Sequence, residues 1–61
     1  MTAEEYEMFD RKVERKMEHA GDDWFAGGWS QMTTICDDKV NAGVLEKRWN
    51  DQAARIEFRA L

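Results

Sequence analysis

Residues 24–36 read WFAGGWSQMTTIC, and the fold class depends on how this stretch folds. Helical spacing places Trp29, Met32 and Cys36 on one stripe, which favours a helix after the glycine pair. The residues between Met32 and Cys36 also have high β-propensity, and two glycines between aromatic residues are typical of a hairpin turn. We expect the helix, because a lone two-stranded hairpin is marginally stable in water.

The segment before this stretch has the clearest pattern in the chain. Thr2 is a candidate N-cap, and Glu5 follows three residues later, which is the spacing of a capping box. Apolar residues share one helical stripe, namely Tyr6, Phe9, Val13, Met17 and Ala20. Gly21 stands where a glycine commonly ends a helix. These signals predict a helix over residues 3–20.

The segment after this stretch also carries a helical stripe of apolar residues, namely Leu45, Trp49, Ala53, Ile56 and Ala60. We predict a helix over residues 44–60. This helix would place Trp49 in the core and Phe58 on its outer side.

The expected fold is therefore all-α, a small three-helix bundle that forms a single domain over residues 1–61. The alternative is two helices packed on a short β-hairpin at about residues 24–36. A chain of 61 residues has a thin core, and its single cysteine excludes an intrachain disulfide. Dense aromatic packing would have to stabilise the chain, and the alternative is stabilisation by formation of a homodimer.

The sequence offers no catalytic constellation. Cys36 falls on an apolar stripe and His19 near a helix end, so we interpret them as a buried small side chain and a surface histidine. The acid pair Asp22-Asp23 lacks the alternating ligands of a calcium loop, and Gly27-Gly28 lacks the lysine of a phosphate loop. We expect no enzyme, no metal site and no cofactor.

Charge bears on the class of partner. The chain carries 13 acidic and 9 basic residues, a net charge of −4, so we expect no direct binding to nucleic acid. Residues 44–61 are an exception, with three acids and four bases. An alternative is therefore a small dimeric helix-turn-helix DNA-binding regulator, with a recognition helix that carries Arg48 and Arg55.

Two sets of outward residues are candidate protein-binding faces. An aromatic ring beside arginines has the composition of an interface hot spot. That face consists of Arg48, Arg55, Phe58 and Arg59. An acidic flank of the first helix suits a basic channel on a partner. That flank consists of Glu7, Glu14 and Glu18.

In size, acidity and absence of catalytic groups, the chain resembles the small phage-encoded inhibitors of host defence known as anti-CRISPR proteins. No motif carries this resemblance. It implies a stoichiometric inhibitor or adaptor that binds a larger protein complex, which can itself be a nucleic-acid-binding one. The remaining alternative is an accessory subunit of a larger assembly. No apolar run could span a membrane, and residues 1–7 lack the basic start and apolar run of a secretory signal, so we expect a cytoplasmic protein, in the host cytoplasm if phage-encoded.

Overall fold

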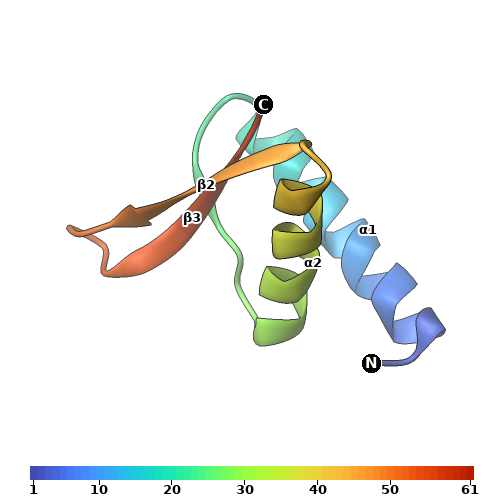
Figure 1. Ribbon diagram of the computed structural model, residues 1–61. Helices are drawn as coiled ribbons and strands as arrows, with labels where there is room; N and C mark the ends of the chain where they lie inside the picture. Colours follow the sequence, from blue (N-terminus) through green and yellow to red (C-terminus); the bar gives the residue numbers. More distant parts are fainter.

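A computed structural model describes all 61 residues and shows an α+β fold. The chain contains two helices and a three-stranded antiparallel sheet with strand order β1-β3-β2. Both helices lie on one side of the sheet, and the β2–β3 hairpin extends away from them (Figure 1). The predicted all-α three-helix bundle is therefore wrong.

Helix α1 spans Ala3–Ala20, as predicted. The Thr2 hydroxyl accepts a hydrogen bond from the Glu5 amide at 3.1 Å, which satisfies one of the free N–H groups of the first turn. The helix ends at Gly21, whose φ of 57° lies in the left-handed region that glycine adopts without steric cost. Phe9 and Val13, from the predicted stripe, are buried.

Helix α2 spans Ser30–Asn41, so the residues that follow the glycine pair form a helix and not one strand of a hairpin. Its buried residues, Met32, Ile35 and Cys36, recur at helical spacing. Residues before it form the short strand β1, Phe25–Ala26, which pairs with β3. The alternative fold is therefore also wrong in its placement of the hairpin at about residues 24–36.

The predicted helix over residues 44–60 does not form. Strand β2, Leu45–Asn50, pairs with strand β3, Arg55–Ala60, in an antiparallel hairpin. In β3 charged and apolar residues alternate, and this period of two suits a strand with one face on a core. The proposed recognition helix for DNA therefore does not exist, and the helix-turn-helix alternative is overturned.

The turn between β2 and β3 has its own local signals. The Asn50 side-chain carbonyl accepts hydrogen bonds from the amides of Gln52 and Ala53 at 3.0 and 3.1 Å. Such an asparagine-centred turn competes with helix formation. Ala54 has a φ of 53°, which reverses the chain into β3.

The core lies between the helices and one face of the sheet. Its seven buried apolar residues are Phe9, Val13, Met32, Ile35, Cys36, Leu45 and Phe58. Gly27 is also buried. A Cβ at this position would lie 2.5 Å from the Thr33 hydroxyl and 3.2 Å from the Phe58 ring, which leaves no room for a side chain. The glycine therefore allows the chain to pass close to both side chains.

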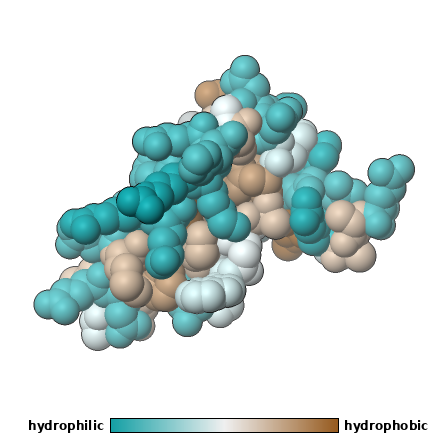
Figure 2. Space-filling view, turned by 180° about the vertical axis from the view of Figure 1, so that it is seen from behind, coloured by the Kyte–Doolittle hydropathy of each residue, from teal (hydrophilic) through white to brown (hydrophobic).

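Two side-chain placements expected from the sequence are reversed. Phe58 is fully buried, because it points from the central strand β3 towards the helices. Trp49 is 59% exposed, and the β2–β3 hairpin that contains it extends away from the helices (Figure 1). Seen from behind, hydrophilic side chains cover most of the molecule, with apolar atoms in a band between them (Figure 2). No helix is both long and apolar enough to cross a membrane.

Candidate functional site

The candidate site is the face of the sheet that the helices do not cover. Alternate residues of β2 and β3 point to this face, opposite the buried Leu45 and Phe58. We name it the arginine face, and its residues are Trp24, Glu46, Arg48, Asn50, Arg55, Glu57 and Arg59.

Glu57 lies at the centre of the arginine face, and only 3% of its surface is exposed. One carboxylate oxygen accepts hydrogen bonds from Arg48 at 2.9 and 3.1 Å and from Asn50 at 3.0 Å. The other accepts two from Arg55, at 2.8 and 3.0 Å. One carboxylate therefore fixes two guanidinium groups in place.

The pKa of the Glu57 carboxyl falls to about 2. The largest cause is the hydrogen bond from Asn50, followed by those from Arg55 and Arg48, and all three favour the charged carboxylate. Glu57 is therefore ionised at neutral pH. It acts as the fixed counter-ion that orders the arginines.

Trp24 provides an aromatic ring on the same face. The guanidinium carbons of Arg48 and Arg59 lie 4.2 and 4.4 Å from its ring centroid, which is cation–π geometry. Arg59 also donates a hydrogen bond to Glu46 at 2.9 Å across the strands. The ring and three arginines thus form one connected surface with restricted side-chain motion.

The arginine face presents groups that can bind a ligand. It carries three arginines against two carboxylates, and 38 to 52% of each arginine side chain remains exposed. Guanidinium groups with free N–H donors bind carboxylates in a planar, two-point geometry. The face holds no hydroxyl, thiol or imidazole that could act as a nucleophile or a base.

The only cysteine and the acidic side chains elsewhere provide no further reactive site. Cys36 is fully buried, and burial raises the pKa of its thiol to about 11. Its thiol is therefore protonated at neutral pH and shielded from solvent. No group of three or more histidine, cysteine or carboxylate side chains is placed to hold a metal ion.

The structure brings together some of the residues selected from the sequence. Arg48, Arg55 and Arg59 share one face, but Phe58 points to the opposite face and is buried. Trp24 takes the place that the sequence interpretation gave to Phe58. The alternation of Trp24 and Phe25 before the glycine pair was the available signal, because neighbouring residues of a strand point to opposite faces.

The acidic flank lies on α1, away from the sheet. Glu7 pairs with Arg11 at 2.7 Å, and Glu14 pairs with Lys39 at 2.6 Å. Glu18 is exposed and takes part in no ion pair. Two of the three carboxylates are therefore partly neutralised by the chain itself, which weakens the acidic flank as a mimic of nucleic acid.

Comparison with protein-family models, with curated proteins and with solved structures finds no match for this chain.

Proposed function

We propose that this protein is a protein-binding module that uses its arginine face, and that it acts as a stoichiometric inhibitor or adaptor of a larger protein complex. The observation that carries the proposal is the contact of Trp24 with Arg48 and Arg59 on an uncovered sheet face. Tryptophan and arginine are the residues most enriched at energetically dominant interface positions.

Order within the face supports binding. Arg48 and Arg55 are held by Glu57 before any partner arrives. Binding of a partner therefore costs less side-chain entropy in these two arginines than it would if they were free. The matching partner surface presents carboxylates, since the face carries one more arginine than it has acids. The choice of an inhibitor of a larger complex comes from the resemblance in size and charge.

Capture experiments with matched variants test the proposal. The tagged protein is immobilised and exposed to nuclease-treated host lysate, and the captured protein is then titrated against Trp24→Ala, Arg55→Ala and Arg11→Ala. Arg11 is the control, because it is an exposed arginine on α1. We expect each of the first two changes to weaken binding by about 30-fold or more, and Arg11→Ala to change it less than about threefold.

Two results would contradict the proposal. One is equal binding by all the variants, each with an unchanged melting temperature. The other is capture of a protein from untreated lysate that does not occur from nuclease-treated lysate.

A further inference from the structure

A second cluster of cations lies on α1, remote from the sheet face described above. Lys12, Arg15 and Lys16 are neighbours on the surface of the helix, and Glu14 and Glu18 line the hollow next to Lys12 and Arg15. No ion pair in the structure includes any of these three cations. Three cations are thus free of ion pairs in a chain whose net charge is −4.

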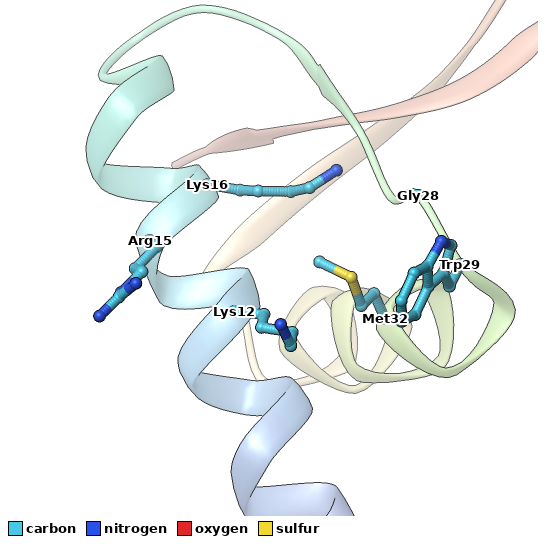
Figure 3. Close-up of a pocket in the computed structure, with 6 residues that line it drawn as sticks. All are labelled: Lys12, Arg15, Lys16, Gly28, Trp29 and Met32. Atoms are coloured by element: carbon cyan, nitrogen blue, oxygen red, sulfur yellow. The ribbon is translucent and has the colours of Figure 1, made fainter.

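These cations border a cleft between α1 and the beginning of α2. The cleft has a volume of about 380 Å³, which falls within the range of small-molecule sites. Figure 3 shows the lining residues, which are Lys12, Arg15, Lys16, Gly28, Trp29 and Met32. Lys12 and Lys16 extend towards the α2 side of the cleft, whereas Arg15 points away from it (Figure 3). Two ammonium groups therefore face the cleft, and the Arg15 guanidinium is directed away from it (Figure 3).

Trp29 provides a flat ring at the same cleft. It is 67% exposed, although tryptophan has a large apolar surface that is usually buried. Its ring meets the buried Phe9 edge-on, with centroids 6.3 Å apart and an interplanar angle of 71°. This contact holds the indole in place while most of its surface stays open to a ligand.

Gly28 lines the cleft beside the Lys16 ammonium. It has a φ of 83°, and a Cβ at this position would lie 3.0 Å from the Lys16 ammonium. The same ammonium donates a hydrogen bond to the Ala26 carbonyl at 3.1 Å. The Lys16 ammonium therefore lies beside residues 26–28, the segment that leads to Trp29.

We propose that this cleft binds a nucleotide, with its base stacked on Trp29 and its phosphate between Lys12 and Lys16. Ammonium groups bind phosphate as point charges, and an exposed aromatic ring stacks on any base. An acidic peptide would use the cations but leave the indole without a planar partner. The nucleotide is either free or part of a single strand, since both present the same phosphate and base.

This proposal does not depend on the arginine face. The cleft lies on the helical side of the molecule, and no residue of the arginine face lines it. Loss of one activity by mutation therefore leaves the other as an internal measure of a correctly folded protein.

The test is a titration of the protein with two probes, adenosine triphosphate and a fluorescein-labelled oligothymidylate. We expect at least one probe to bind, and a fourfold rise in salt concentration to weaken oligothymidylate binding about tenfold if two to three phosphates are neutralised. Binding of adenosine triphosphate alone identifies a free nucleotide as the ligand, and binding of oligothymidylate identifies a single strand.

Variants locate the binding. Lys12→Gln with Lys16→Gln removes two charges from the cleft, and Arg11→Gln with Lys47→Gln removes two charges outside it. Both double variants have the same net charge, so only the first should lose binding, by about tenfold or more. Trp29→Leu keeps an apolar contact with Phe9 but removes the stacking surface, and we expect a loss of about 5- to 150-fold.

Two outcomes would overturn the proposal. The first is that the folded natural protein binds neither probe at low salt. The second is equal loss of binding in the two double variants, which would show a general effect of net charge. Trp29→Phe provides the check on folding, because it keeps an aromatic ring and should retain most of the binding.

Discussion

Glu57 is the residue on which the order of the arginine face depends. Its carboxylate accepts hydrogen bonds from Arg48, Asn50 and Arg55, and only a charged carboxylate accepts all of them. Protonation of this one side chain would release two arginines at once. At the scale of single residues, the acid at the centre is therefore as important as the cations around it.

The lowered pKa of Glu57 predicts a pH dependence of stability. Because the pKa is about 2 in the folded protein against an ordinary value of 4.5, the stabilisation is present above pH 4.5 and is lost as the pH falls towards 2. The melting temperature should therefore fall more steeply across this interval in the natural protein than in Glu57→Gln. Identical slopes in both proteins would show that the network does not stabilise the fold.

Phe58 and Trp49 give opposite predictions at the same scale. Phe58 is fully buried in the core, so Phe58→Ala should cost about 3–5 kcal/mol and abolish cooperative unfolding in so small a domain. Trp49 is mostly exposed, so Trp49→Ala should cost less than about 1 kcal/mol. Thermal unfolding of the two variants checks both values. A larger loss for Trp49→Ala would support the helix predicted over residues 44–60.

At the scale of elements, α1 was predictable and the hairpin was not. The cap at Thr2, the apolar stripe and the stop at Gly21 all act locally and agree, so the helix bounds follow from nearby residues. Residues 44–60 satisfy two periods, because their apolar positions fit a helical stripe while the charged and apolar residues of β3 alternate. Pairing with β1 and packing on the helices favour the strands, and neither is visible in the local sequence.

The candidate site divides in the same way. The three arginines share one face, as expected, because outward positions of either a helix or a hairpin would gather them. Their role in binding stays a prediction. Phe58 was assigned to the wrong side, because the side-chain direction depends on the element type. Trp24 was missed, since its contact with Arg48 and Arg59 arises only when β1 joins the sheet.

The β2–β3 turn allows a direct test of the element assignment. Ala54 has a φ of 53°, where a Cβ is unfavourable, so Ala54→Gly should stabilise the protein by up to about 1 kcal/mol. This change should raise the melting temperature by a few degrees, about 4–8 °C at the upper limit. Ala53→Gly is the matched control and should give no increase. If residues 44–60 were a helix, each glycine would instead cost about 1 kcal/mol.

At the scale of the whole molecule, the arrangement in two layers separates the two surfaces that we propose bind a protein and a nucleotide. The helices bury one face of the sheet, and the opposite face holds Trp24 and the arginines. The cleft beside Trp29 lies on the helical side. The molecule measures 34 Å along its long axis and 20 Å across. Because the arginine face and the cleft share no residue, we expect a protein partner and a nucleotide to bind together.

This separation predicts that the two activities are independent. Trp24→Ala should weaken binding to the captured protein without changing the affinity for the nucleotide probe, and Trp29→Leu should do the reverse. Titrations of each variant with both ligands measure this. If either variant lost both activities while it retained the natural melting temperature, the two surfaces would not be separate.

The most direct test of the central claim is a map of the surface that the captured protein covers. Nuclear magnetic resonance spectra of the labelled chain would follow the Nε–H signals of Arg48, Arg55 and Arg59, the indole signal of Trp24 and the backbone amides of α1. Protein binding through the arginine face predicts that the arginine and Trp24 signals shift on addition of the partner while the amides of residues 7–18 stay in place. Shifts confined to residues 7–18, with the arginine signals unchanged, would contradict it and assign the partner to the acidic flank.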